Sequence, residues 1–325
     1  MSKRAEICVE QMKPFRNMKA GNLESVVLKE QMDVHGYVLV RDLLPSRDLN
    51  PLLGEITGML SGAGWLEPNC DPIQRTASAS AACADGDPTY KPTRDEIFGF
   101  QSLHALPHHP LLQRLMKLLV GEHLLIHPKP EMRLIFPNFE HGIIHAHQDH
   151  TSVAGDEESF TAWIPLHDCP LELGPLRILE GSHRFGLQRT AGETGYIPRG
   201  MERGDDWVGG DINSGDVLLF HSLTVHEAAP NRSSQLRISL DYRFQSYERA
   251  VNPAVFVFAS GKRSWESTYA NWTSDELKYY WTKLPLRLKP SKRELIELAQ
   301  SSKSAKLRER YSRILEGFAS KAPNA

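Results

Sequence analysis

His147-Gln148-Asp149 decides the fold of this 325-residue chain, together with the later stretch Gly215-Asp-Val-Leu-Leu-Phe-His-Ser-Leu-Thr-Val-His226. The later stretch reads as a turn followed by apolar strand residues that end at a histidine. Side chains alternate along a strand, so His147 and Asp149 are predicted to share one face. His226, arriving from a distant strand, adds a second imidazole, and this ligand set is typical of non-haem Fe(II) oxygenases. These three residues are the predicted metal ligands and catalytic core.

Short apolar segments separated by Gly, Pro, Asn and Asp dominate the chain after Leu124. The predicted strands are Arg133–Phe136, Ile143–Gln148, Phe160–Leu166, Leu176–Leu179, Asp216–Phe220, Thr224–Glu227 and Leu236–Gln245. Many short strands with such turns favour a double-sheet jelly roll. The predicted fold class is therefore mainly β with flanking α, a cupin-like double-stranded β-helix with helices packed outside.

The chain is expected to divide into three parts: a loose polar lead-in over 1–24, one jelly-roll domain over 25–250, and a C-terminal helical extension over 251–325. The domain is predicted to begin with a helix, a strand at Tyr37–Arg41, and a second helix capped by Ser46 or Asp48. Leucines at helical spacing predict another helix over 108–120.

Two long segments rich in Gly, Pro and small residues, 61–95 and 186–213, are predicted as loops that close over a substrate. The tail from Lys278 to Ala325 holds twelve Lys or Arg residues and four Glu residues. Such a charge run is usually a solvated helix face, and an acidic partner or a dimer contact is the alternative.

Several sequence segments, in their order along the chain, resemble those of the phytanoyl-CoA dioxygenase family, which uses iron and 2-oxoglutarate. The resemblance runs from about Val34 to Tyr247 and includes the following segments besides the metal ligands: His35-Gly-Tyr-Val-Leu-Val-Arg-Asp-Leu-Leu44, Trp163-Ile-Pro-Leu, Gly174-Pro-Leu-Arg-Ile-Leu-Glu-Gly-Ser-His183 and His226-Glu-Ala-Ala-Pro-Asn231. It implies Fe(II) as the metal, 2-oxoglutarate as cosubstrate and O₂ as oxidant, with succinate and CO₂ released.

The resemblance also suggests a cosubstrate site. Arg237, eleven residues after His226, matches the arginine that pairs with the distal carboxylate of 2-oxoglutarate, and a planar guanidinium suits that task. Gln148, Trp163 and Arg133 are further candidates for cosubstrate binding, with Lys129 as another cation and core packing as the alternative for Trp163. The family sometimes places a hydroxyl two residues after the distal histidine, where this chain has Ala228.

Asp149 bears on the type of reaction. Related halogenases carry Gly or Ala there and free a coordination position for halide, so the carboxylate favours hydroxylation. The resemblance implies a small-molecule substrate from secondary metabolism; desaturation and ring formation stay open. The alternatives are a cupin-type isomerase or hydrolase with another metal, and a non-catalytic metal-binding module. His145, His150, His183 and His221 are expected to be structural.

The composition narrows the partners and the compartment. A net charge of −2 provides no electrostatic footprint for nucleic acid or for an anionic membrane. No apolar run approaches the roughly 18 residues that span a bilayer, and the first residues lack the apolar core of a signal peptide. The four cysteines have no paired spacing, which indicates reduced thiols. We expect a cytoplasmic monomer or homodimer.

Overall fold

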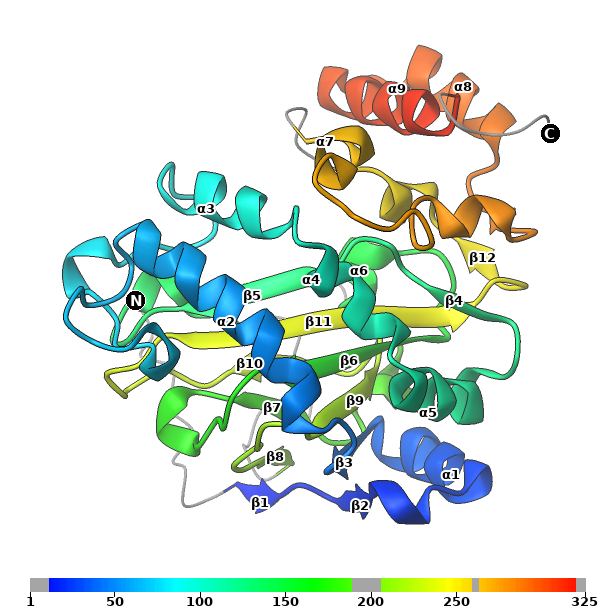
Figure 1. The fold of residues 1–325 in the computed structure, drawn as a ribbon. Coiled ribbons are helices and arrows are strands. Elements are labelled where there is room, and N and C mark those ends of the chain that lie inside the picture. Colours follow the sequence, from blue (N-terminus) through cyan, green and yellow to red (C-terminus); the bar gives the residue numbers. More distant parts are fainter. Residues whose placement is uncertain (1–11, 189–205, 259–262, 320–325) are drawn as a thin grey trace.

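Two β-sheets, one of them covered by helices, form the body of the protein in the computed structural model, which describes residues 12–188, 206–258 and 263–319 (Figure 1). The larger sheet has the order β2 (Asn17–Lys19), β3 (Tyr37–Arg41), β9 (Val217–His221), β6 (Ser159–Pro165), β11 (Arg237–Ser246) and β4 (Leu124–Ile126), with β5 (Glu131–Ile135) also paired to β11. The smaller sheet has the order β1 (Lys13–Pro14), β8 (Trp207–Gly209), β7 (Leu176–Leu179) and β10 (His226–Ala228). This arrangement confirms the predicted double-stranded β-helix.

The helices lie outside the sheets, as predicted. They are α1 (Ser25–His35), α2 (Ser46–Gly62), α3 (Tyr90–Ile97), α4 (Gln101–Ala105), α5 (Pro110–Val120), α6 (His150–Val153), α7 (Trp265–Tyr269), α8 (Lys292–Ser301) and α9 (Ala305–Ala319). Helices α1, α2, α4 and α5 bury their apolar residues in one cluster with the outer face of the larger sheet. None of the described helices is both long and apolar enough to cross a bilayer.

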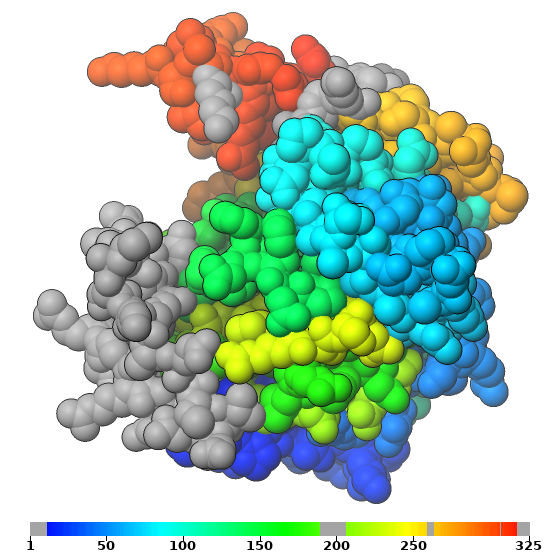
Figure 2. Space-filling model, turned by 90° about the vertical axis from the view of Figure 1, so that its left-hand side faces the viewer, coloured from blue at the N-terminus to red at the C-terminus, as the bar shows by residue number. Residues whose placement is uncertain are grey.

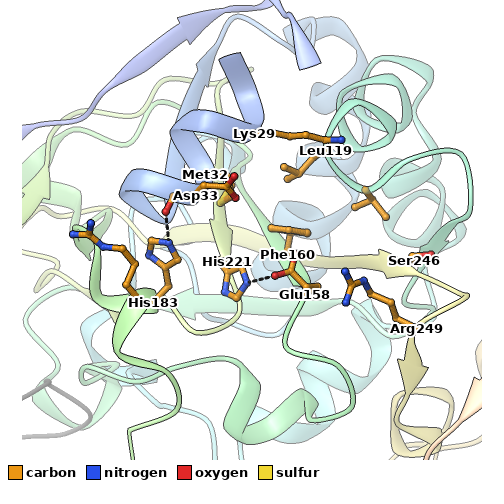
Figure 3. Close-up of a pocket in the computed structure, with 12 residues that line it drawn as sticks. Lys29, Met32, Asp33, Leu119, Glu158, Phe160, His183, His221, Ser246 and Arg249 are labelled. Carbon is orange, nitrogen blue, oxygen red and sulfur yellow. Dashed lines mark hydrogen bonds and ion pairs between the residues drawn. The ribbon is translucent and has the colours of Figure 1, made fainter. Parts of the chain in front are cut away.

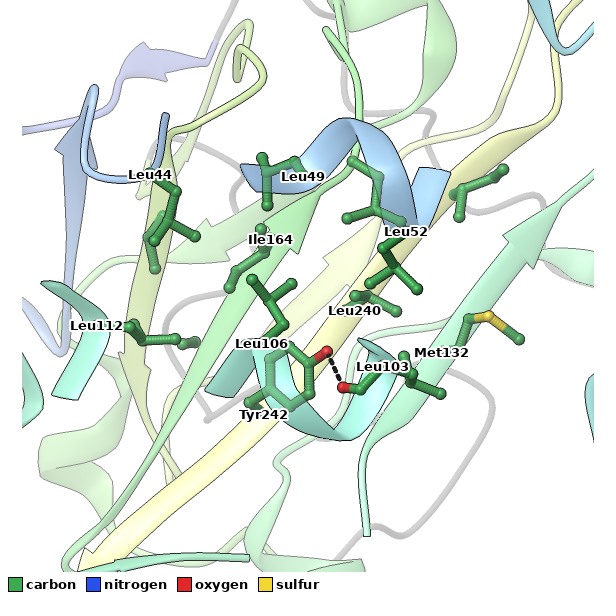
Figure 4. Packing of buried hydrophobic residues seen from close by; sticks show 14 of the residues in the cluster. Leu44, Leu49, Leu52, Leu103, Leu106, Leu112, Met132, Ile164, Leu240 and Tyr242 are labelled. Atoms are coloured by element: carbon green, nitrogen blue, oxygen red, sulfur yellow. Dashed lines mark hydrogen bonds between the residues drawn. The ribbon is translucent and has the colours of Figure 1, made fainter. Parts of the chain in front are cut away.

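Strand β11 has two chemically different faces, because side chains alternate along a strand. One face packs beneath α2, α4 and α5 and consists of Ile238, Leu240, Tyr242 and Phe244. The Tyr242 hydroxyl donates a hydrogen bond of 2.7 Å to the Leu103 carbonyl and ties α4 to the strand (Figure 4). The other face points between the sheets and consists of Arg237, Ser239, Asp241, Arg243 and Gln245.

The space between the sheets is apolar at its other end. Residues from β3, β6, β7 and β9 meet there in a second cluster, which includes Tyr37, Leu39, Trp163, Ile178, Leu218 and Phe220. Both faces of β3 and β9 are thus buried, which explains why these strands read as continuous apolar runs. The polar residues of the interior are concentrated along β11.

The C-terminal part packs on the barrel through an aromatic cluster. Trp265, Tyr269, Trp272 and Trp281 gather there with Val153 of α6 and Leu125 of β4. The short strands β12 (Ala250–Val251) and β13 (Arg287–Leu288) pair in parallel within it. The expected boundary at residue 251 stays a prediction, but the extension touches the helix that directly follows Asp149.

Several local expectations were wrong. Ile143–Gln148 forms no strand; it contributes only an isolated bridge between His147 and His226. Residues 13–14 and 17–19, expected in a loose lead-in, pair with β8 and β3 as edge strands. Helix α3 occupies part of the predicted loop 61–95. The N-cap of helix α2 is Pro45, not Ser46 or Asp48, and no side chain forms a capping hydrogen bond there. Within the other predicted loop, β8 was missed, and 189–205 lie outside the described residues.

Candidate active site

The three predicted metal ligands meet at one point. Nε2 of His147 lies 3.8 Å from Oδ1 of Asp149, and Nε2 of His226 lies 3.9 Å from the same oxygen. All three ligand atoms lie within 4.8 Å of one another, and no other group of at least three His, Cys, Asp or Glu side chains with such spacing occurs in the described part of the chain. The arrangement can hold one divalent metal ion on two imidazoles and a carboxylate.

The backbone route to this geometry differs from the expected one. His147 and His226 exchange two backbone hydrogen bonds of 3.0 Å, so the bridge itself brings the two rings together. Asp149 has helical backbone angles at the start of α6 and reaches the site from a turn. Alternation along one strand, the predicted reason for the proximity of His147 and Asp149, is therefore not what brings Asp149 to His147.

Both imidazoles are oriented through their second ring nitrogen. Nδ1 of His147 lies 2.8 Å from the His145 carbonyl, and Nδ1 of His226 lies 3.0 Å from the Thr224 carbonyl. A carbonyl only accepts hydrogen bonds, so each Nδ1 carries the proton and each Nε2 presents a lone pair. Burial lowers the pKa of His226 to about 3 and lowers that of His147 as well, which keeps both rings neutral. Neutral imidazole is the form that binds metals.

Two residues missed at the sequence level hold Asp149. Thr161 donates a 2.6 Å hydrogen bond to Oδ2, and Arg243 approaches Oδ1 at 3.2 Å through Nη2 and Oδ2 at 3.4 Å through Nε. They face each other across β6 and β11. Burial alone would raise the pKa of Asp149, but Arg243 and the two imidazoles hold it well below its usual range. The carboxylate is therefore ionised and fixed in place.

Arg237 is fully buried on the inner face of β11. One terminal nitrogen, Nη1, donates to the carbonyl of Gly174, while Nε and Nη2 are buried without a partner among the described residues. Gly174 has φ +77°, and a Cβ there would lie 2.3 Å from the Ala229 carbonyl oxygen, so only glycine fits. An unpaired buried guanidinium costs free energy unless an anion joins it.

Two other unpartnered polar atoms belong to the same interior surface. In the part of the chain that the structure describes, the indole Nε1 of Trp163 and the hydroxyl of Ser239 are buried without hydrogen-bond partners. Trp163 also lies beneath Arg237, with 5.9 Å between the guanidinium carbon and the ring centre. Three residues with donors to spare suit a carboxylate-bearing ligand. Ser239 was missed, although its position two residues after Arg237 on a strand would have indicated it.

The remaining predicted cosubstrate residues are placed differently. Arg133 faces the interior opposite Ser239 and lies 3.6 Å from Asp241. Gln148 is fully buried, but its amide bonds the backbone of Leu223, Gly186 and Gln188, so it fastens the chain after Ser182. Lys129 follows β4 and donates to the Val257 carbonyl at 3.2 Å.

The histidines expected to be structural include two in a separate surface pocket of about 510 Å³ (Figure 3). There His183 contacts the Asp33 carbonyl through Nε2 at 3.0 Å, and His221 lies 3.7 Å from Glu158. Residues 85–88 and 91–95 of the predicted loop 61–95 line a larger cleft of about 1260 Å³, which also reaches Glu96, Lys129 and Glu131. That loop thus borders the same end of the barrel as Lys129.

This chain is similar to proteins of a known family. The family model described as phytanoyl-CoA dioxygenase matches residues 32–239. The 1-deoxypentalenic acid 11-beta-hydroxylase of Streptomyces exfoliatus is 24% identical over 235 residues, which cover 66% of this chain and 78% of that protein. The phytanoyl-CoA dioxygenase of Arabidopsis thaliana is 32% identical over 102 residues, 30% of this chain and 36% of that protein.

A solved structure also shares the fold. The epimerase SnoN, in complex with Fe³⁺, alpha ketoglutarate and nogalamycin RO, superposes with a TM-score of 0.53 at 21% identity, covering 74% of this chain and 91% of that one. At this level of identity the similarity supports the architecture alone.

Proposed function

Because this chain belongs to the phytanoyl-CoA dioxygenase family, we propose that it is an Fe(II)- and 2-oxoglutarate-dependent oxygenase that hydroxylates an unactivated C–H bond of a small-molecule metabolite. His147, Asp149 and His226 would hold the iron, and their ligand atoms have the required spacing. Iron with 2-oxoglutarate and O₂ supplies the oxidising power, while the protein supplies position and the exclusion of water.

The observation that carries the proposal is the fully buried Arg237 with two unpartnered nitrogens. A cupin-type isomerase or hydrolase uses the same barrel and a similar metal site, but it does not need a spare buried guanidinium. Arg237 would bind the distal carboxylate of 2-oxoglutarate. The Ser239 hydroxyl would supply the contact that Ala228 cannot, and Trp163 would donate from the side.

Arg243 and Thr161 act as positioning residues in this proposal. Their hydrogen bonds set the direction of the Asp149 carboxylate, which leaves Oδ1 turned toward the two histidines. The presence of a carboxylate at this position favours hydroxylation over halogenation. Secondary metabolism is the proposed context, since the bacterial relative is named for hydroxylation of 1-deoxypentalenic acid.

A titration without oxygen tests the metal and cosubstrate assignments together. Full-length protein with Fe(II) and 2-oxoglutarate should develop a weak visible charge-transfer band, and exposure to air should release succinate. His147→Ala and His226→Ala should remove the band, whereas His221→Ala, a change in the separate surface pocket, should keep it. A wild-type protein that takes up no iron would contradict the proposal.

The finer expectations stay part of the proposal. Cys70, Cys83 and Cys169 are free thiols, in keeping with a cytoplasmic enzyme. A monomer or homodimer that binds neither nucleic acid nor membranes is the expected form, and light scattering during gel filtration measures the oligomeric state.

A further inference from the structure

A cavity of about 550 Å³ lies between the C-terminal helix α9 and the end of the barrel that carries Arg243. Its walls come from four places: the chain after β4, helix α6, residues 254–258, and α9. Figure 2 shows the red C-terminal helices overhanging the green part of the barrel, with a recess beneath them. The volume falls within the range of small-molecule pockets, about 300–1,000 Å³.

The lining is apolar on one side and cationic on the other. Val153, Val255, Val257, Phe258 and Leu307 provide the apolar surface. Leu307 is 39% exposed, so its side chain is available to contact a molecule in the cavity. The basic residues that line the cavity are Lys129, Arg243, Arg310 and Arg313, against the acidic Glu131 and Glu309.

The basic residues differ in how far they are already neutralised. Arg313 pairs with Glu309, and Arg243 pairs with Asp149. Lys129 contacts only the Val257 carbonyl, and Arg310 makes no hydrogen bond or ion pair with any residue that the structure describes. Burial lowers the pKa of Lys129; Glu131 opposes this shift, whereas Arg243 and Arg310 add to it. An anion in the cavity would relieve the unfavourable burial of the lysine.

The cavity is connected to the metal site through two elements. Arg243 lines the cavity and also binds Asp149, and α6, which follows Asp149 directly, contributes Thr151, Ser152 and Val153 to the wall. A ligand held here therefore lies beside the residues that orient a metal ligand. Arg243 uses Nε and Nη2 on Asp149, and its Nη1 has no partner among the described residues.

We propose that this cavity binds the acidic group and part of the apolar frame of the primary substrate, which we infer to be a hydrophobic carboxylic acid. Lys129 and Arg310 would hold the carboxylate, with Nη1 of Arg243 as a third donor, and Leu307 and Phe258 would contact the carbon frame. The proposal rests on the oxygenase function proposed above. Helix α9 lies beyond the family match at residues 32–239, so this wall is a feature of this chain rather than of the matched domain.

Rigid probes with one carbon frame and different head groups test the inference. Calorimetry on full-length protein loaded with Fe(II) and 2-oxoglutarate under nitrogen would compare four ligands: adamantane-1-carboxylate, its carboxamide, 1-adamantylphosphonate and 1-adamantylammonium. The carboxylate should bind at least about tenfold more tightly than the neutral carboxamide, because hydrogen bonds to charged groups are the stronger ones. Preference for the ammonium would assign the head-group site to Glu131 and overturn the proposal. Preference for the phosphonate would overturn the carboxylate assignment.

Variants locate the binding. Lys129→Gln should weaken binding of the carboxylate probe on the order of 10- to 100-fold and leave binding of the carboxamide probe nearly unchanged. Arg310 lies on an exposed helix face, so Arg310→Gln is not expected to affect folding. It should weaken binding of the carboxylate probe about two- to fivefold. Arg293→Gln is the matched control, since Arg293 on α8 is 90% exposed and does not line the cavity.

The outcomes separate this inference from the function on which it rests. Equal binding of carboxylate and carboxamide in a sample that shows the charge-transfer band refutes the acid site and leaves the oxygenase function intact. A missing band refutes the oxygenase function, and the head-group preference of the cavity is then still measured on the same protein.

Discussion

Replacing Arg237 and Arg243, one at a time, by methionine should affect the ligand-free protein in opposite ways. Both arginines lie on the inner face of β11, six residues apart; Arg237 is fully buried, and the Arg243 side chain is 11% exposed. Arg243 has a carboxylate partner in Asp149, whereas Arg237 has a single carbonyl partner and two unpartnered nitrogens. The two changes remove the same charge and similar volume. The difference between their effects on the free energy of unfolding therefore reports the contribution of the carboxylate partner.

The expected magnitudes follow from these contacts. Arg243→Met leaves Asp149 buried with Thr161 as its one remaining hydrogen-bond donor among the described residues, and breaking a buried ion pair costs about 3–5 kcal/mol. Arg237→Met loses one hydrogen bond, worth about 1 kcal/mol, but also removes unsatisfied donors that cost about 1–3 kcal/mol. The free energy of unfolding should therefore fall by several kcal/mol in the first variant and stay level or rise slightly in the second.

Urea unfolding in the presence of a metal chelator, followed by tryptophan fluorescence, measures these changes. Adding Mn²⁺ should restore part of the stability of Arg243→Met, because the ion gives Asp149 a counter-charge. Arg237→Met should instead weaken the binding of 2-oxoglutarate by about 30- to several-thousand-fold. This corresponds to the cost of about 2–5 kcal/mol for losing one member of a buried charge pair. A loss of stability in Arg237→Met as large as in Arg243→Met would refute the claim that Arg237 awaits an anion.

Three further predictions concern buried polar residues. Ser239→Ala should weaken the binding of 2-oxoglutarate about 5- to 15-fold in calorimetry, the equivalent of one hydrogen bond. Ser246→Ala, at the end of the same strand, should leave this affinity unchanged. Asp149→Gly should abolish hydroxylation, scored by product and succinate, and normal turnover would show that Asp149 is not a ligand. Burial lowers the pKa of His104 and His127 to about 4 and that of His167 to about 3, below the value of about 6.5 in an unfolded chain. The unfolded chain then binds more protons below about pH 6.5. The free energy of unfolding from urea titrations should therefore be flat above that pH and fall toward about pH 4, by at most about 1.4 kcal/mol per pH unit for each histidine.

Local pattern was enough to predict most of the strands. β3 and β7 have the predicted bounds, and the strands around β6, β9, β10 and β11 differ by one or two residues at either end. These segments are apolar runs bounded by turn residues, so the signal lies within the segment itself. The segment Ile143–Gln148 runs beside β10, but it forms only the His147 bridge and one further backbone hydrogen bond, from the Ala228 N–H to the Ile144 carbonyl, which is too few for a strand.

The site was predicted as far as motifs reach. Motif spacing proposed the three metal ligands and the family resemblance proposed Arg237, but the partners of Asp149 were missed. Thr161 lies twelve residues from Asp149 and Arg243 lies 94 residues away, and only the pairing of β6 with β11 brings them together. The alternation from Arg237 would have indicated Ser239 and Arg243, since both share its face.

The charges inside the barrel explain why Arg237 needs a ligand. The polar interior and its rim hold three arginines, Arg133, Arg237 and Arg243, and three acidic residues, Glu131, Asp149 and Asp241. Arg243 pairs with Asp149, and Arg133 lies close to Asp241, which leaves Arg237 as the cation without a carboxylate partner. A divalent metal adds two positive charges to this set, and a dianion such as 2-oxoglutarate cancels them while reaching Arg237. Charge balance therefore makes the metal and the dianion better ligands together than either is alone, because burying either charge singly is costly.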